Sequence, residues 1–247
     1  MLETRGLSKR FGAVHVTRDV SLRLQRGERR VILGPNGAGK TTLFNQLVGE
    51  TRPDAGQILL AGEDVTGLTV QARARRGLSR SYQRNTLFDG LTVEENLGLA
   101  AAVAHGHWHS IRHDSLTRHD VRDTVREVAE QLRLMPHLHA RVGDVSYGVR
   151  RQLEVAVALA TRPLVLLMDE PTSGVGPEMS RGFHDLLNDL PRDLTLLIIE
   201  HDMDLAFAVA DSITVLNHGE VVFDGSPEDA RGSRLLKDIY LGHWADA

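Results

Sequence analysis

The chain has 247 residues, of which 41% are hydrophobic and 25% charged, and its formal net charge is −4. This composition supports a globular core, and a mildly acidic chain without a long basic run argues against nucleic acid as the main partner. The chain contains no cysteine, which excludes disulfides and thiolate metal sites. The N-terminus lacks the apolar stretch of a signal peptide, and the longest apolar runs are too short to cross a bilayer. We therefore expect any membrane role to depend on a partner.

The first elements expected along the chain are strands. Residues 20–25 alternate apolar and polar side chains, which is typical of a half-exposed strand, and residues 57–61 form a second candidate between two glycines. Residues 30–33 are more apolar and favour a buried strand. The early chain thus indicates a small antiparallel sheet, and residues 30–33 indicate a separate strand that is fully buried.

A phosphate-binding motif follows this buried strand. Residues 34–41 match G-x-x-x-x-G-K-[ST], a loop whose backbone N–H groups surround a polyphosphate. Lys40 is expected to reach the β- and γ-phosphates, and the Thr41 hydroxyl can bind Mg²⁺. Residues 42–48 favour a helix whose positive N-terminal end faces the phosphates. The predicted phosphate-binding residues are Gly34, Pro35, Asn36, Gly37, Ala38, Gly39, Lys40, Thr41 and Thr42.

The middle of the chain favours helices. Thr92 and Glu95 have the spacing of a capping box at a helix start. An apolar stripe of one helix face follows, formed by Val121, Val125, Val128 and Leu132. Three arginines indicate a solvated helix face, namely Arg73, Arg75 and Arg76. Five histidines in a connecting segment are more typical of a solvated loop than of a metal site, and these are His105, His107, His109, His113 and His119.

Two later apolar runs, residues 164–168 and 194–199, favour central parallel strands. Asp169 and Glu170 follow the first run, where one carboxylate can hold Mg²⁺ and the next can act as a general base. His201 follows the second run, at the sheet edge where ligands collect. Residues 212–216 and 221–223 favour a hairpin. Further core positions are expected at Val209, Val215, Leu235, Leu236 and Ile239.

The order and spacing of these motifs resemble an ABC-type ATPase (ATP-binding cassette). The informative element is Ser146-Tyr147-Gly148, which separates this family from other phosphate-loop enzymes. Gln83, which alone has almost no specificity, also fits the pattern. More narrowly, the chain resembles the ATPase subunits of branched-chain amino acid importers, in residues 7–12, 86–96, 146–148, 151–156, 199–204 and 239–242.

The resemblance implies an α/β fold of the P-loop NTPase class. A RecA-like parallel-sheet core would carry an antiparallel β subdomain and an inserted helical subdomain. Residues 1–247 would form a single domain. Within it, about 1–85 and 160–247 would be the nucleotide-binding core with the β subdomain, and about 86–159 the helical subdomain.

The resemblance also implies roles for residues of this chain. Phe11 would stack on the adenine of ATP, and Lys40 with the loop amides would hold the phosphates. Glu170 would be the general base, with His201 and Gln83 as further catalytic residues. The Mg²⁺ ligands would be Thr41, Gln83 and Asp169.

The implied partners lie outside this chain. Ser146 and Gly148 would complete the site of a second ABC ATPase subunit, as a homodimer or heterodimer. A groove near Gln83, Leu87 and Phe88 would receive an integral membrane permease, which in turn meets a solute-binding protein. The chain would lie peripherally on the cytoplasmic face of the inner membrane, without nucleic acid. On the residues alone, Leu87 and Phe88 could equally be core.

Three positions depart from the family pattern. Val149 and Arg150 stand where Glu or Gln and then Gln are usual, and Gly176 replaces Asp or Asn. Arg150 could pair with phosphates or face solvent. One expectation is an asymmetric pair in which this chain offers the weaker half-site. Alternative functions are a urea or amide importer, an envelope-lipid exporter, a soluble ABC protein acting on ribosomes or DNA, and a kinase.

Overall fold

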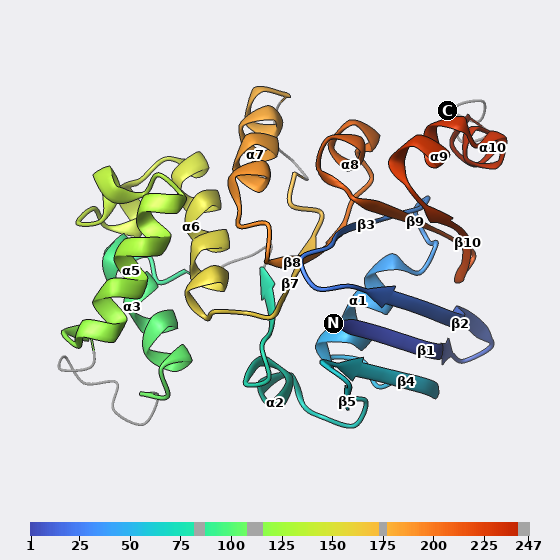
Figure 1. Ribbon diagram of the computed structural model, residues 1–247, viewed down its shortest axis with the longest axis horizontal. Helices are drawn as coiled ribbons and strands as arrows, with labels where there is room; N and C mark the ends of the chain where they lie inside the picture. The colour runs from blue at the N-terminus through green and yellow to red at the C-terminus, as the bar shows by residue number, and fades with distance from the viewer. Residues whose placement is uncertain (82–86, 108–115, 173–176, 242–247) are drawn as a thin grey trace.

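The computed structural model describes residues 1–81, 87–107, 116–172 and 177–241, and its strands form two sheets (Figure 1). The first sheet is antiparallel, in the order β2-β1-β4-β5. Its strands are β1 (Leu2–Phe11), β2 (Val14–Leu24), β4 (Ala55–Leu60) and β5 (Glu63–Asp64). Val20, Leu22 and Leu24 are buried while their neighbours are exposed, so the alternating pattern correctly predicts one face of β2.

The second sheet has the order β10-β9-β3-β8-β7-β6. Its strands are β3 (Arg29–Leu33), β6 (Leu78–Ser81), β7 (Val165–Asp169), β8 (Thr195–Ile199), β9 (Ser212–Asn217) and β10 (Glu220–Gly225). Strands β9, β3, β8, β7 and β6 run parallel, and β10 pairs antiparallel with β9. Every residue of β3, β7 and β8 is buried, as expected for strands covered on both faces.

Helix α1 (Lys40–Val48) begins just after β3, and the short α2 (Val70–Ala74) precedes β6. Helices α3 (Val93–Ala104), α5 (His119–Gln131) and α6 (Tyr147–Ala160) pack against one another, to one side of the sheets in Figure 1. The predicted capping box at α3 is confirmed, since the Glu95 N–H donates to Thr92 Oγ1 and the Thr92 N–H to Glu95 Oε2. The predicted apolar stripe of α5 is buried throughout.

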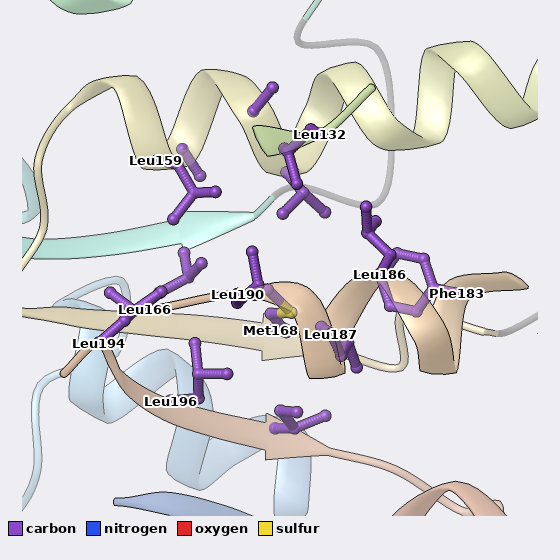
Figure 2. Close-up of a cluster of buried hydrophobic side chains, with 14 of the residues drawn as sticks. Leu132, Leu159, Leu166, Met168, Phe183, Leu186, Leu187, Leu190, Leu194 and Leu196 are labelled. Atoms are coloured by element: carbon purple, nitrogen blue, oxygen red, sulfur yellow. The ribbon is translucent and has the colours of Figure 1, made fainter. Parts of the chain in front are cut away.

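A continuous core connects this helical group to the parallel sheet. Helix α7 (Pro177–Asp189) covers the sheet with Phe183, Leu186 and Leu187, while Met168 and Leu196 face it from the strands (Figure 2). Leu132, Leu159 and Leu166 belong to the same cluster. A shift of α6 or α7 therefore disturbs packing against the strands that carry the carboxylates.

The C-terminal part contains α8 (Met203–Val209), the β9–β10 hairpin, α9 (Pro227–Gly232) and α10 (Arg234–Leu241). The predicted hairpin is confirmed. The core predictions for Val209, Val215 and Leu236 are confirmed, and Ile239 packs partly buried against the core. The prediction for Leu235 is wrong, because α10 turns this side chain outward and leaves it 49% exposed.

The prediction of a solvated arginine face is wrong for Arg73, which is 1% exposed. Its guanidinium donates to the carbonyls of Gln46 and Leu47 at the end of α1, and to those of Thr66 and Leu68. Burial lowers the pKa of this group from its ordinary value. The remaining two arginines, Arg75 and Arg76, are exposed as predicted.

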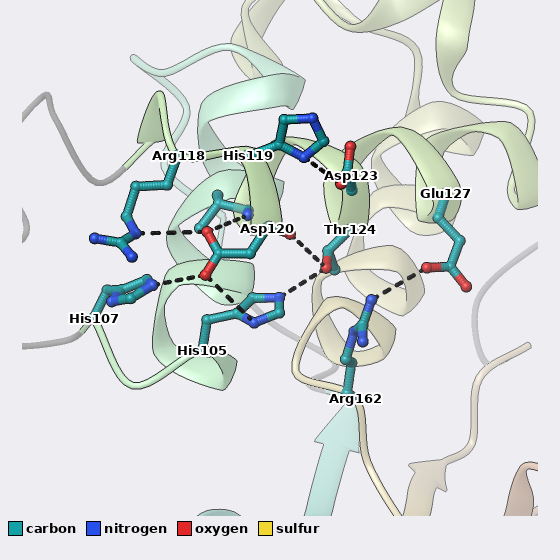
Figure 3. A network of polar contacts seen from close by, with 10 residues as sticks. His105, His107, Arg118, His119, Asp120, Asp123, Thr124, Glu127 and Arg162 are labelled. Atoms are coloured by element: carbon teal, nitrogen blue, oxygen red, sulfur yellow. Dashed lines mark hydrogen bonds and ion pairs between the residues drawn. The ribbon is translucent and has the colours of Figure 1, made fainter.

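His105 and His107 are half-buried and bonded within the helical group rather than solvated (Figure 3). Nε2 of His107 lies 2.9 Å from Asp120 Oδ2, and Nε2 of His105 lies 2.9 Å from Thr124 Oγ1. The hydrogen bond from His107 lowers the pKa of Asp120 to about 2. His119 is exposed, and His109 and His113 lie outside the described residues. Across the described part of the chain, no cluster of three or more metal-ligating side chains occurs.

Candidate nucleotide-binding and hydrolysis site

The phosphate-binding motif occupies the loop between β3 and α1, at the carboxyl end of a central parallel strand. The Lys40 side chain is buried, and Nζ donates to the carbonyl oxygens of Gly34 at 2.6 Å and Pro35 at 3.1 Å. Burial lowers the pKa of Lys40, and the carboxylates of Glu170 and Asp169 oppose that shift. The positive charge of Lys40 therefore interacts with the negative charges of Glu170 and Asp169.

Two loop glycines are required by their neighbours as well as by backbone geometry. A Cβ at Gly34 would lie 2.2 Å from the carbonyl oxygen of Leu216, and one at Gly39 would lie 2.3 Å from that of Val16. Gly37 differs, because its φ is +79° but a Cβ at this position would meet nothing within 4 Å. The inner side of the loop is thus packed against β2 and β9, while Gly37 faces open space.

The rest of the loop presents backbone and small polar groups. Asn36 and Thr41 are exposed, Pro35 and Thr42 are half-buried, and Ala38 is buried. A hollow of ≈ 240 Å³ lies beside the loop, lined by Pro35, Asn36, Gly37, Ala38, Asn217, His218 and Ile239. The sequence indicated Asn217 and His218 only as part of a hairpin turn, and the β9–β10 turn brings them to this place.

Phe11 ends β1 and is 53% exposed as a residue. The ammonium of Lys9 lies 5.5 Å from the centre of the Phe11 ring. An exposed aromatic face with a neighbouring cation can stack on a flat heterocycle.

The carboxylates predicted from the sequence lie at the tip of β7. Asp169 is the last residue of the strand and only 7% exposed, and burial with the neighbouring Glu170 charge raises its pKa above the ordinary value. Glu170 follows at φ +43°, a conformation that costs energy for a residue other than glycine. Its N–H donates to the Ile199 carbonyl at 2.8 Å. Glu170 therefore leaves the extended conformation of β7, which ends at Asp169.

The carboxylate of Glu200 is a site feature that the sequence interpretation missed. Glu200 is completely buried, and Oε1 accepts from the N–H of Thr172 at 3.1 Å and from its hydroxyl at 2.7 Å. Oε2 accepts from the N–H of His201 at 3.0 Å and lies 3.7 Å from its Nδ1. The His201 ring itself is exposed. A charged residue immediately after an apolar strand was the available signal, and its role becomes clear only from the contacts.

Ser146 and Gly148 lie on α6, in the helical group rather than at the phosphate loop. Ser146 caps α6, and the Val149 N–H donates to its Oγ at 3.4 Å. Ser146 is exposed and Gly148 half-buried, so this helix start is accessible from outside. Arg150 does not simply face solvent, because it is half-buried, pairs with Asp89 at 2.6 Å and donates to the Val142 carbonyl.

The structure thus brings the phosphate loop, Asp169, Glu170 and His201 to one sheet edge, and places the Ser146 segment on another element. Gln83 and Gly176 lie outside the described residues. The Thr41 hydroxyl and the Asp169 carboxylate are hard oxygen donors, so their chemistry fits Mg²⁺. The described helices include none long and apolar enough to span a membrane.

A phosphate loop between a parallel strand and a helix, with carboxylates at a neighbouring strand tip, defines a P-loop nucleoside triphosphatase. A family model described as "ABC transporter" matches residues 17–173. The branched-chain amino acid transport ATP-binding protein BraF of Pseudomonas aeruginosa is 35% identical over 98% of both chains. This chain therefore belongs to the ABC transporter family, and it is an ATP hydrolase.

Two further relatives have similar coverage. The lipopolysaccharide export system ATP-binding protein LptB of Haemophilus influenzae is 36% identical, over 98% of this chain and 97% of its own. The ADP conformation of the ATP-binding cassette MJ1267 superposes with a TM-score of 0.83 at 28% identity, covering 98% of both chains. The resemblance inferred from the motifs and the predicted fold class are confirmed by these comparisons.

Proposed function

We propose that this chain is the ATP-hydrolysing subunit of an importer for branched-chain or related amino acids. The observation that carries the proposal is the sheet edge at which Lys40, Asp169, Glu170 and His201 converge. The likeness to BraF over nearly the whole of both chains supports the substrate class. The energy of ATP binding and hydrolysis would drive transport through a separate permease.

The residues of the site have distinct roles in this proposal. Lys40 and the loop amides hold the phosphates, and Phe11 stacks on the adenine. Glu170 takes a proton from the attacking water. His201, oriented by Glu200, contacts the γ-phosphate. Mg²⁺, held by Thr41, Asp169 and Gln83, would neutralise charge that develops on the phosphates.

The proposed partners follow from the exposed elements. The accessible start of α6 would complete the ATP site of a second ATPase subunit through Ser146 and Gly148. Phe88 is 58% exposed beside the half-buried Leu87, which supports a permease groove at this position. Gln83, proposed for the same groove, lies outside the described residues. The chain would lie peripherally on the cytoplasmic membrane face, and would serve a solute-binding protein only indirectly. In this arrangement about 86–159 forms the helical subdomain within a single domain.

Two substitutions test the hydrolytic roles. Lys40→Ala should lose ATP binding or turnover. Glu170→Gln should still bind ATP but hydrolyse it more slowly, by about 10²- to 10⁴-fold, because the base is lost while the phosphate contacts remain. Full hydrolysis by the Glu170→Gln protein would remove Glu170 from the role of base.

The transport role is tested in cells and in the isolated complex. The chain is used as bait to recover its membrane complex, and uptake of radiolabelled leucine is compared between cells with the wild-type and Glu170→Gln chains. We expect a permease in the complex and loss of uptake with the variant. Unchanged leucine uptake combined with recovery of a lipid-export permease would replace the importer by an exporter, and a ribosomal complex without permease would replace both.

A further inference from the structure

Arg151 connects the start of α6 to the residue that follows Glu170. Its Nε and Nη2 donate to the carbonyl oxygen of Pro171, at 3.0 and 2.8 Å. Its Nη1 pairs with Glu154 on the same helix. One side chain thus bridges the helical group and the end of the parallel sheet.

The surroundings hold this guanidinium in a defined position. The side chains of Arg151 and Glu154 are 14% and 15% exposed, and the guanidinium lies 5.9 Å from the centre of the Phe183 ring. A half-buried arginine with two bonds to one carbonyl and an ionic partner keeps little freedom. The contact is therefore a directed connection rather than a chance surface bond.

The same short segment is held from its opposite side. Pro171 follows Glu170 directly, and Thr172 is bonded through its N–H and hydroxyl to the buried Glu200. Residues 170–172 therefore lie between a contact from α6 and a contact from the end of β8. Since Glu170 has a strained φ of +43°, its direction depends on what holds its neighbours.

A space beside the contact leaves room for adjustment. A cavity of ≈ 200 Å³ is lined by Gly148, Arg151, Gln152, Pro171, Gly182, Phe183 and Leu186. Gly148 and Pro171 thus face the same hollow, with Arg151 connecting its two walls. A small displacement of the first turn of α6 can therefore reach Pro171 through Arg151, with space beside the contact for the movement.

We propose that Arg151 is a positioning residue, which transmits the position of the partner-facing start of α6 to the general base Glu170. The proposal rests on the roles proposed above for Ser146, Gly148 and Glu170. When Ser146 and Gly148 contact the nucleotide of the partner subunit, the start of α6 shifts. Arg151 then moves the Pro171 carbonyl through its hydrogen bonds and so orients Glu170. ATP held in one site of the pair thereby promotes hydrolysis in the other.

The test uses the membrane complex with Arg151→Met, Arg151→Lys or Arg150→Met in this chain. ATPase rates are measured against ATP concentration and divided by the number of sites that bind ATP. Arg151→Met should lower kcat on the order of 10- to 100-fold with KM changed less than about twofold, because a misplaced base affects the reaction rather than binding. Arg151→Lys should recover part of kcat, since its ammonium can donate to the same carbonyl.

Arg150→Met is the matched control, because Arg150 neighbours Arg151 on α6 but bonds to Asp89 and Val142. It should keep kcat close to the wild-type value. The Arg151→Met change should have less than a twofold effect when added to Glu170→Gln, since the base that it positions is already absent.

Equal kcat values for Arg151→Met and Arg150→Met would overturn the proposal, as would an undiminished effect of Arg151→Met in the Glu170→Gln background. If Arg151→Met does not fold, Arg151→Lys takes its place in the test. The proposal then requires that Arg151→Lys lowers kcat while KM changes less than about twofold. Fast hydrolysis by Glu170→Gln alone would instead overturn the assignment of the base, so the two failures are distinguishable.

Discussion

Arg73 stabilises the end of α1 that is opposite to the phosphate loop. A helix end has carbonyl groups without partners inside the helix, and a positive charge at that end is favourable. Arg73 supplies both hydrogen bonds and charge to Gln46 and Leu47. Its position within a run of arginines predicted a solvated face, because sequence spacing alone does not show that one side chain reaches a helix end.

We predict that Arg73→Met destabilises the protein by about 2–4 kcal/mol, because several buried carbonyl oxygens lose their donor. Urea unfolding measures this loss. Arg76→Met is the control, since Arg76 pairs with Glu63 at the surface and should contribute less than about 1 kcal/mol. Equal unfolding midpoints for the two variants would contradict the structural role of Arg73.

The ionised Asp169 should make the protein less stable at neutral pH than a neutral side chain at the same position would. Burial raises the pKa of Asp169 above 3.8, so the folded protein holds this proton more tightly than the unfolded chain. Stability should therefore fall as pH rises from 3.8 through the raised pKa, and the loss should persist above it.

The change Asp169→Asn removes this cost. Without Mg²⁺ and nucleotide, we expect the variant to be more stable than the wild-type protein at pH 7, because the buried charge is absent. The advantage should be smaller at about pH 3, below the ordinary carboxyl pKa, where the wild-type carboxyl is protonated in both the folded and the unfolded protein. Thermal unfolding at both pH values measures this, with the exposed Asp123→Asn as control. A wild-type protein that is the more stable at pH 7 would refute the sign.

At the scale of elements, two helix starts with similar chemistry differ in their bonding. At α3, Thr92 and Glu95 satisfy each other's backbone in both directions. At α6, the third position is Val149, which has no polar group to return the bond, and the Ser146 bond is long at 3.4 Å. The Ser146 hydroxyl therefore adds little to its own helix and is accessible to a ligand.

We predict opposite consequences for the two caps. Thr92→Ala should lower stability by about 1 kcal/mol and leave kcat unchanged. Ser146→Ala should change stability by less than about 0.5 kcal/mol, because its bond is already weak, yet it should impair ATP hydrolysis. Unfolding and ATPase assays on the same preparations separate the effects. A Ser146→Ala protein with wild-type turnover would contradict the proposed role of α6.

Patterns within one element were sufficient to predict much of the local structure. Buried strands β7 and β8 were recognisable as apolar runs, and α5 by its stripe. The direction of a single side chain in a short helix was harder, as the neighbours Leu235 and Leu236 show. Only one of these two residues is buried, because the choice depends on how α10 lies on the hairpin and α9.

At the scale of the whole molecule, the proposed composite site predicts association that depends on ATP. Glu170→Gln protein with Mg²⁺ and ATP should approximately double in mass, because unhydrolysed nucleotide then bridges two chains. Size-exclusion chromatography with light scattering measures this change. Adding Ser146→Ala should reduce it. A protein that binds ATP but remains monomeric at every concentration would contradict pairing with itself and favour a sister subunit.

The sequence predicted the residues at the sheet edge because motif spacing indicates where strands end. It did not predict the connections among them. Glu200 and Arg151 act on Thr172 and Pro171 from elements distant in the chain, and such contacts depend on how the helical group lies against the sheet. The positions of these residues at the sheet edge could therefore be predicted from the sequence, whereas the contacts that hold their neighbours in place could not.

The packing behind the phosphate loop has a consequence for how such loops tolerate mutation. Gly34 and Gly39 are fixed by carbonyl oxygens of β9 and β2, which leave no room for a Cβ. Gly37 has no such neighbour. A descendant that abandoned nucleotides could replace Gly37 by asparagine without a steric clash, at the cost of backbone strain at φ +79°, yet would still need Gly34 and Gly39 to fold. A relative that has lost Gly37 but kept Gly34 and Gly39 would thus be one that no longer binds nucleotide but keeps the fold.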